Sequence, residues 1–393
     1  MFLFSNRIFP IKFISLLFLI LLSGVWITPS ATAQLYNTPA AQALLMDADT
    51  GTVLFAKEPD ARIPPASLAK LMTMEVVFHQ LKTGKLSLEE RFFVSENAWR
   101  KGGASSGGST MFAELNSEIP LEDLIKGVIV QSANDGCIII AEGLAGSEAA
   151  FAGLMNERAR KLGLNGSFFT NSTGLPDEDQ YVSIRDLAKL AQHVIREYPE
   201  YYRYYKEPEF EWNKILQRNR NPLLKMNIGA DGMKTGFTEA SGYGIVGTAI
   251  RNDQRLIAVM SGMKSKRQRA EEARKIIDWG FRAFEKFSLF ENGEVIGRAN
   301  VYGGVTPGVG VVGKGPVEIY LPIGNRDKLK ARIVYNGPLI PPVSEGDKIA
   351  TLKVWIGDEL SQETDLYAAE TVTKGGIKRQ AIDAAKELLF GWL

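Results

Sequence analysis

Cysteine and histidine are nearly absent from this chain, which has 1 Cys and 2 His in 393 residues. A single cysteine cannot close an internal disulfide, so the fold has no disulfide framework, and we expect Cys137 to be a small buried residue. His79 and His193 are not placed among cysteine or acidic residues at metal-ligand spacing. These absences argue against a zinc hydrolase and against a Ser-His-Asp triad, and we expect no metal ion and no other cofactor.

An excess of charge of either sign is also absent. Lys and Arg together number 46 and Asp and Glu together 45, which gives a formal net charge of +1 at pH 7. A chain without a net field has no general attraction for a polyanion, so we expect no nucleic-acid partner. The length of 393 residues is sufficient for a leader segment and two domains with cores of their own.

A long apolar run occurs only at the N-terminus. Two basic residues precede a nearly unbroken apolar stretch over 13–27, and Ala31-Thr32-Ala33 gives the small-x-small pattern of a cleavage site. We therefore expect residues 1–33 to be a signal peptide and the rest of the chain to be exported. An uncleaved anchor is the alternative, and it is less favoured because the run is shorter than the roughly 20 residues that a spanning helix needs.

Ser67 and Lys70 lie three residues apart at the expected start of a helix. Pro64 and Pro65 do not suit a helix interior, so the helix should begin at about Ser67, and apolar residues then recur at helical spacing up to a stop at Gly84. Residues i and i+3 share a helix face with Cβ atoms about 5–6 Å apart, so the lysine is placed to act as the base that a serine nucleophile needs. Such a pair is common on exposed helices, and two further motifs decide its meaning.

Ser132-Ala133-Asn134 and Lys234-Thr235-Gly236 follow Ser67-Leu68-Ala69-Lys70 in the order that marks serine β-lactamases and penicillin-binding proteins. The chain resembles the low-molecular-mass penicillin-binding proteins of the serine D-Ala-D-Ala carboxypeptidase family, from about Ala41 to the C-terminus. Further stretches that carry the resemblance are Met46-Asp47-Ala48-Asp49-Thr50-Gly51, Asn97-Ala98-Trp99, Gln131-Ser132-Ala133-Asn134-Asp135, Asn171-Ser172-Thr173-Gly174-Leu175, Arg185-Asp186-Leu187-Ala188 and Asp278-Trp279-Gly280-Phe281.

The resemblance implies a catalytic role for three residues, with a peptidoglycan stem peptide as substrate and β-lactams as inhibitors. Ser67 would attack the carbonyl of the penultimate D-Ala and expel the terminal D-Ala. Lys70 would take the Ser67 proton, with Lys234 as the cation that helps to keep the Lys70 amine neutral. Ser132 would relay a proton to the leaving amine.

The same resemblance implies a set of substrate-binding residues, which are Asn134, Lys234, Thr235, Gly236, Phe237 and Arg269. The backbone N–H groups of Ser67 and Phe237 would form the oxyanion hole, and Gly236 would leave room for the substrate to lie along its strand. Some relatives carry a polar residue where this chain has Phe237, so only the backbone role carries over. Arg269 falls where several members bind a carboxylate, and the Gly-rich stretch 102–108 would border the cleft. Other basic residues near Arg269 are Lys264, Lys266, Arg267 and Arg274.

The order of predicted elements indicates an α/β (α+β) transpeptidase fold of the penicillin-binding-protein and β-lactamase type. A hairpin over 42–56 precedes a helical region that is broken at 132–135, and two strands within 243–261 precede a helix over 267–284. The later part of the chain has short β-prone runs with frequent Gly and Pro. We expect a catalytic domain over 34–290 with an antiparallel sheet and flanking helices, a small all-β domain over 291–372 and a terminal amphipathic helix over 373–393.

The C-terminal segment predicts a surface-lying amphipathic helix. Its apolar side carries Ile377, Ala381, Ile382, Ala384, Ala385, Leu388, Leu389, Trp392 and Leu393, and its polar side carries Arg379, Gln380, Asp383, Lys386 and Glu387. Two residues depart from this pattern: Lys378 falls on the apolar side and Phe390 on the polar side. The basic bias and Trp392 suit a lipid surface, and the resemblance implies attachment to the outer, periplasmic face of the cytoplasmic membrane. The alternative is a helix docked on its own β-rich domain.

Three other functions remain open from the residues alone. A class A β-lactamase carries a deacylating glutamate, in a Glu-x-x-Leu-Asn setting, and here Lys161 occupies that position. A D-Ala endopeptidase that cuts peptidoglycan crosslinks shares the three motifs and is not separated from a carboxypeptidase by sequence. A catalytically silent wall-binding protein is disfavoured, because the serine and lysine residues of all three motifs are intact.

Overall fold

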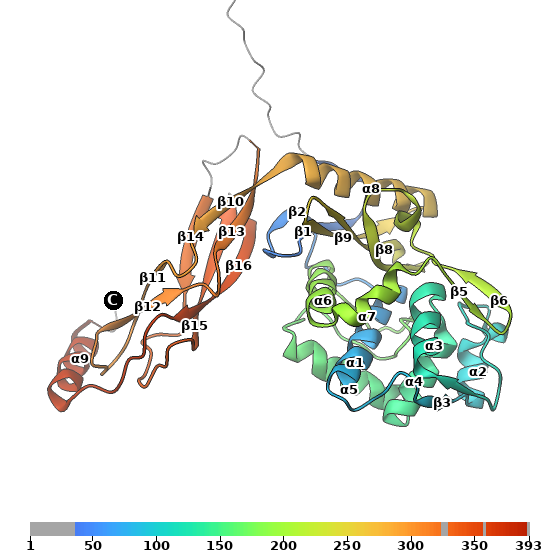
Figure 1. Ribbon diagram of the computed structural model, residues 1–393, viewed down its shortest axis with the longest axis horizontal. Helices are drawn as coiled ribbons and strands as arrows, with labels where there is room; N and C mark the ends of the chain where they lie inside the picture. The colour runs from blue at the N-terminus through green and yellow to red at the C-terminus, as the bar shows by residue number, and fades with distance from the viewer. Residues whose placement is uncertain (1–35, 324–328, 357–358, 391–393) are drawn as a thin grey trace, which may run out of the picture.

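The structure is a computed structural model that describes residues 36–323, 329–356 and 359–390. The predicted signal peptide at 1–33 and the last residues of the predicted tail, 391–393, lie outside the described residues. Figure 1 shows two parts: a larger part with mixed helices and strands, and an elongated strand-rich part that ends in a helix.

A five-stranded antiparallel sheet forms the centre of the larger part. Its strands in spatial order are β2 (Val53–Lys57), β1 (Gln42–Asp47), β9 (Gln254–Met263), β8 (Gly242–Arg251) and β7 (Ala230–Thr238). Successive side chains of a strand face opposite sides of the sheet. Leu45 therefore belongs to the core beneath α8 (Lys266–Ala283), together with Ile276, whereas Leu44 belongs to the helical core on the other face.

Helices fill the space between β2 and β7 in the sequence and cover the second face of the sheet (Figure 1). They are α1 (Lys70–Lys82), α2 (Glu96–Gly102), α3 (Leu121–Lys126), α4 (Asn134–Ala145), α5 (Glu148–Lys161), α6 (Ile184–Glu197) and α7 (Pro199–Tyr202). Two small hairpins accompany them, β3 (Arg91–Phe93) with β4 (Glu118–Pro120) and β5 (Glu209–Trp212) with β6 (Ile215–Arg218). The predicted antiparallel sheet with flanking helices is confirmed.

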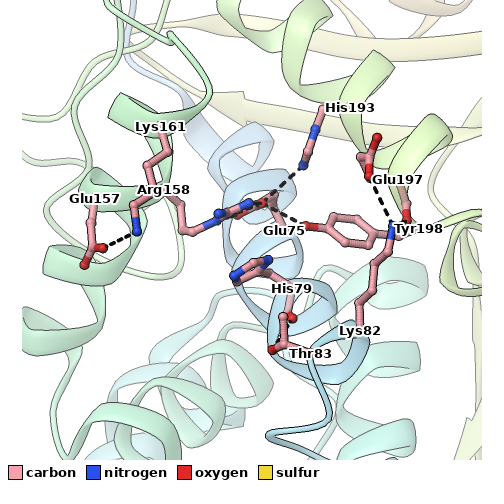
Figure 2. A network of polar contacts seen from close by, with 10 residues as sticks. All are labelled: Glu75, His79, Lys82, Thr83, Glu157, Arg158, Lys161, His193, Glu197 and Tyr198. Atoms are coloured by element: carbon pink, nitrogen blue, oxygen red, sulfur yellow. Dashed lines mark hydrogen bonds and ion pairs between the residues drawn. The ribbon is translucent and has the colours of Figure 1, made fainter. Parts of the chain in front are cut away.

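The helix α1 is fixed to its neighbours by the buried carboxylate of Glu75 (Figure 2). Arg158 of α5 donates to this carboxylate from Nε at 3.1 and 3.2 Å and from Nη2 at 2.5 Å. The Tyr198 hydroxyl donates to it at 3.2 Å, and Nε2 of His193, from α6, lies 3.4 Å from it. Burial raises the pKa of Glu75, but His193 and Arg158 more than offset this, so its pKa lies below the ordinary value. The helix that carries Lys70 is thereby held by groups from α5, α6 and the residue that follows α6.

The strand-rich part contains a five-stranded antiparallel sheet with its own core. The strands in spatial order are β11 (Gly297–Asn300), β12 (Gly308–Val312), β16 (Glu359–Ala368), β15 (Lys348–Ile356) and β14 (Leu329–Val334). A further pair consists of β10 (Phe284–Phe290) and β13 (Val317–Pro322). The predicted boundary at 290/291 leaves β10 in the catalytic domain, whereas its pairing with β13 joins it to the strand-rich part. Hydrogen bonds that connect the parts include Thr52 Oγ1 to Gln362 Oε1 at 2.7 Å, Ser361 Oγ to the Val53 carbonyl at 3.1 Å and the Ile323 N–H to the Ala283 carbonyl at 3.0 Å.

A last helix, α9 (Ile377–Phe390), lies at the end of the strand-rich part that is remote from the catalytic part (Figure 1). Its polar side meets the strand-rich part: the Gly303 N–H donates to Asp383 Oδ2 at 3.0 Å, and Gln380 Nε2 donates to the Gly375 carbonyl at 2.7 Å. Ile377 on its apolar side is 85% exposed.

Among the described residues, no single helix is both long enough and apolar enough to cross a membrane. The helices α4 and α5 meet the length and composition criteria only as a pair, bent by 84°. Most of α4 is buried in the helical core.

Candidate active site

Ser67 lies in a 3₁₀ turn, Ala66–Ala69, that runs directly into α1 at Lys70. We expected an α-helix from about Ser67, so the start of the α-helix is later than predicted, whereas its end at Lys82, just before Gly84, agrees with the prediction. Residues i and i+3 eclipse one another in a 3₁₀ turn. The tighter turn therefore aligns the two side chains, and Lys70 Nζ lies 3.2 Å from Ser67 Oγ.

Lys70 is 1% exposed, and its amine makes two further hydrogen bonds. It donates to Asn134 Oδ1 at 2.8 Å and to the Thr173 carbonyl at 2.5 Å. Burial lowers the pKa of Lys70, and the positive charge of Arg220 lowers it further. An amine with a lowered pKa is neutral over more of the neutral range, which is what a general base requires.

Lys234 is buried beside Thr235, to whose carbonyl its amine donates at 3.1 Å. Its pKa lies well below the ordinary value because of burial and because of the positive charges of Lys70, Arg220 and Arg269. We predicted Lys234 as the cation that acts on Lys70, and the positive charge of Lys70 does lower the pKa of Lys234. Arg220 is a further positive charge that lowers the pKa of Lys70, which the sequence did not indicate.

Ser132 stands at the break between a π-helical turn, Gly127–Gln131, and α4. Its backbone is left-handed, with φ +67°, which is uncommon for a residue with a side chain and marks functional or strained positions. Its hydroxyl is buried and has no hydrogen-bond partner among the described residues. A buried, unpaired hydroxyl at the wall of a cavity is available to a ligand.

Asp135, the residue after Asn134, holds the segment that completes this wall. Its carboxylate accepts from Thr110 Oγ1 at 2.6 Å and from the Met111 and Ala113 N–H groups at 3.0 and 3.1 Å. The Asn134 N–H donates to the Ser109 carbonyl at 2.7 Å. These bonds bring Ser109, the residue that follows the Gly-rich stretch 102–108, into the site.

A cavity of ≈ 560 Å³ opens in front of Ser67 and Ser132. The predicted residues Thr235, Gly236, Phe237 and Arg269 line it, and so do Ser109, Arg220, Tyr243 and Lys266. The other predicted residues lie just behind this lining. Lys70 contacts the lining residue Ser67 and also bonds to Asn134, and Lys234 contacts the lining residue Thr235. The structure therefore brings every predicted site residue to one place.

Gly236 has a structural role in addition to the predicted one. A Cβ on Gly236 would lie 3.2 Å from Ala66 Cβ and 3.3 Å from the Leu68 nitrogen. The missing side chain therefore lets β7 lie directly against the turn that carries Ser67. This contact sets the separation between the serine and the Lys-Thr-Gly strand.

Aromatic and basic side chains form the outer wall of the cavity. Phe237 stacks on Tyr243 with ring centroids 4.2 Å apart, and the Arg269 guanidinium lies 5.7 Å from the Tyr243 ring. Burial lowers the pKa of Arg269 to about 10, and its Nε has no hydrogen-bond partner among the described residues. Of the neighbouring basic residues, Lys266 lines the cavity, whereas Arg267 is ion-paired with Glu271 at 2.7 Å.

Sequence reasoning missed four residues of the site: Ser109, Thr173, Arg220 and Tyr243. Thr173 lies in a stretch that carries the resemblance, but it contributes only its carbonyl to the site, and Arg220 lies outside the three motifs, so neither was assigned to the site from its sequence. Arg220 is held by a hydrogen bond from Nη1 to Ser109 Oγ at 2.5 Å. Lys161, at the position of the lactamase glutamate, is ion-paired with Glu157 at 2.6 Å on the exposed face of α5, so the β-lactamase alternative is not favoured.

Comparisons with known proteins agree over almost the whole chain. The family model for D-alanyl-D-alanine carboxypeptidase matches residues 28–265, and that for the penicillin-binding protein 5, C-terminal domain, matches residues 284–374. The D-alanyl-D-alanine carboxypeptidase DacC of Escherichia coli (strain K12) is 38% identical over 359 residues, which are 89% of each chain. DacA of Haemophilus influenzae is 37% identical over 352 residues, 89% of this chain and 87% of that one.

Solved structures show the same fold. Penicillin binding protein 5 from Haemophilus influenzae superposes with a TM-score of 0.73 at 36% identity, covering 86% of this chain and 99% of the other. The chain belongs to the D-alanyl-D-alanine carboxypeptidase family, and it is a serine-type D-Ala-D-Ala carboxypeptidase and penicillin-binding protein with a mostly β C-terminal domain.

Proposed function

We propose that Ser67 is the nucleophile of this carboxypeptidase and Lys70 its general base. Lys70 takes the hydroxyl proton while Ser67 Oγ bonds to the carbonyl carbon of the penultimate D-Ala. The C–N bond then breaks, the terminal D-Ala leaves with a proton delivered through Ser132, and water hydrolyses the acyl ester. The distance of 3.2 Å between Lys70 Nζ and Ser67 Oγ, at a buried amine, is the observation that carries this assignment.

The substrate carboxylate is the natural partner of the positive charges around the cavity. Lys234, Arg220 and Arg269 are all buried enough for their pKa values to fall, and Arg269 Nε is unpaired among the described residues. A carboxylate that enters the cavity relieves this repulsion and accepts charge-assisted hydrogen bonds. The Ser67 and Phe237 backbone N–H groups then receive the oxyanion of the penultimate carbonyl.

Product analysis tests the activity directly. The purified enzyme is incubated with a muropeptide that carries a pentapeptide and, separately, with a crosslinked dimer, and the products are identified by mass. Loss of one alanine from the pentapeptide, with the dimer intact, is expected. Cleavage of the dimer alone identifies an endopeptidase instead, and no product from either contradicts the assignment of Ser67 as an active nucleophile.

We also propose that the protein is exported and attached to the outer, periplasmic face of the cytoplasmic membrane through α9. The predicted signal peptide supports export. The docking of Gln380 and Asp383 toward the strand-rich part, which leaves Ile377 exposed, supports a helix whose apolar side faces a lipid surface. The docked-helix alternative requires the apolar side to be covered instead.

Truncation tests this attachment. A variant that ends at Lys374 should lose binding to anionic vesicles and keep its activity on a soluble pentapeptide. Equal vesicle binding by the full and truncated chains, or unfolding of the truncated chain, favours the docked-helix alternative.

A further inference from the structure

A second cavity, of ≈ 510 Å³, is lined by residues of α9 and of the strand-rich part. The helix α9 lies at the end of that part that is remote from the catalytic part (Figure 1). Its lining includes Tyr302, Pro338, Arg379 and Asp383, none of which takes part in the proposed catalytic steps. Its volume is typical of sites that hold a small molecule or a headgroup.

The cavity presents one positive and one negative side chain next to each other. Arg379 Nε lies 3.4 Å from Asp383 Oδ2, and within the part of the chain that the structure describes it has no hydrogen-bond partner. Asp383 Oδ2 also accepts the Gly303 N–H at 3.0 Å, which fixes the carboxylate in place. A purely anionic ligand would meet the carboxylate and a purely cationic one the guanidinium. A ligand that carries both charges satisfies both groups.

Apolar side chains are exposed around the same cavity. Ile377 is 85% exposed, Ile340 78% and Val305 56%. Each stands within three residues of a residue that lines the cavity. Exposed aliphatic side chains that gather near a polar cavity are expected where a protein meets the boundary between lipid headgroups and acyl chains.

We propose that this cavity binds the phosphoethanolamine headgroup of a membrane phospholipid, with the phosphate on the Arg379 guanidinium and the ammonium on the Asp383 carboxylate. The aromatic rings of Tyr302 and Tyr335, which also line the cavity, flank the ammonium. The acyl chains leave over the three exposed apolar side chains. This inference rests on the proposed attachment of α9 to a membrane and names the lipid that the attachment selects.

The carboxylate is the reason for choosing ethanolamine over choline. A primary ammonium has three N–H donors for Asp383, whereas a trimethylated ammonium has none. Aromatic rings attract both cations, so the tyrosines alone do not discriminate. A guanidinium binds a phosphate through two parallel hydrogen bonds, which fixes the other end of the headgroup.

Vesicle binding by the full mature chain tests the proposal. Vesicles of phosphatidylcholine alone are compared with vesicles in which half of the lipid is phosphatidylethanolamine, for the wild type, Arg379→Gln and Asp383→Asn. The asparagine keeps an oxygen for the Gly303 N–H and removes the charge. Arg298→Gln is the matched control, because it removes one positive charge from the same part of the chain at a residue outside the cavity lining.

The wild type should bind the ethanolamine vesicles about tenfold more tightly, the effect of one charge-assisted hydrogen bond of about 1.5 kcal/mol. The two cavity variants should lose this preference, and Arg298→Gln should keep it. Equal binding of both lipids by the wild type, or an unchanged preference in Arg379→Gln, overturns the proposal. Fluorescent penicillin labelling shows that the catalytic part of each variant is folded, and circular dichroism compares the strand-rich part with that of the wild type.

A soluble headgroup separates this inference from the membrane attachment. Binding of glycerophosphoethanolamine to the full chain, followed by calorimetry, should be lost in Arg379→Gln and in Asp383→Asn. Headgroup binding without vesicle binding supports the cavity and contradicts the attachment. Vesicle binding that is lost on truncation, but without headgroup binding or lipid preference, supports the attachment and contradicts the cavity.

Discussion

Removal of Arg158 should destabilise the catalytic part strongly, because it leaves the Glu75 carboxylate charged and buried. The Glu75 side chain is 0% exposed and that of Arg158 is 16% exposed, with three contacts of 2.5 to 3.2 Å between them. Breaking a buried pair from one side costs about 3–5 kcal/mol, and the partial exposure of Arg158 favours the lower end. At about 2–4 °C per kcal/mol for a domain of this size, Arg158→Ala should lower the Tm by roughly 6–12 °C.

Thermal unfolding of Arg158→Ala, with Lys161→Ala as the matched control, measures this effect. Lys161 and Glu157 form an exposed pair on the same helix, with side chains 59% and 50% exposed, so its loss should cost less than about 1 kcal/mol. The double variant Glu75→Leu/Arg158→Leu should recover much of the stability, because apolar replacement of a buried pair is often close to neutral. Equal Tm shifts for Arg158→Ala and Lys161→Ala would refute the reasoning.

The pH dependence of this effect has a definite sign. The folded-state pKa of Glu75 lies below its ordinary value of 4.5, so its pairing stabilises the protein fully above that value. The contribution is lost as the pH falls through the folded-state pKa. The Tm difference between wild type and Arg158→Ala should therefore be largest near neutral pH and should shrink below about pH 4.

Further predictions concern the active site and the buried cysteine. Ser67→Ala should abolish covalent labelling by a fluorescent penicillin, and stoichiometric labelling of that variant would remove Ser67 as the nucleophile. Lys70→Ala should slow acylation about 10²–10⁴-fold and keep the native circular dichroism spectrum. In the wild type, the acylation rate should rise with pH, because Lys70 acts as a base only when it is neutral. The rate should reach half its maximum below pH 10.5, the ordinary lysine value, because burial lowers the Lys70 pKa. Cys137 should resist thiol reagents in the native enzyme, since burial raises its pKa to about 12, and fast modification without unfolding would contradict its position in the core.

The sequence by itself determined the chemistry of the site. A spacing of three residues on a helical turn places Lys70 beside Ser67 as a possible base, but such pairs are common. The two later motifs, Ser132-Ala133-Asn134 and Lys234-Thr235-Gly236, and the family resemblance that all three carry identified the pair as catalytic. The hairpin β1–β2, the strands β8 and β9, and the helix α8 were also predictable, because each carries its apolar period within one segment.

Tertiary structure alone decided which residues from distant segments complete the site. Arg220 lowers the Lys70 pKa and Thr173 accepts its hydrogen bond through a backbone carbonyl, and neither role leaves a mark in the local pattern. The predicted role of Gly236 was to leave room for the substrate. The structure adds a second role, because the missing side chain lets β7 pack against the turn that carries Ser67.

The sequence also did not predict which side of α9 contacts the rest of the protein. Helical periodicity separates its apolar side from its polar side but does not say which side meets the rest of the protein. The Gly303 N–H and the Gly375 carbonyl, backbone groups that no side-chain pattern reports, receive its polar side and leave Ile377 exposed. Local periodicity fixes each element, and only long-range packing fixes which surface it covers.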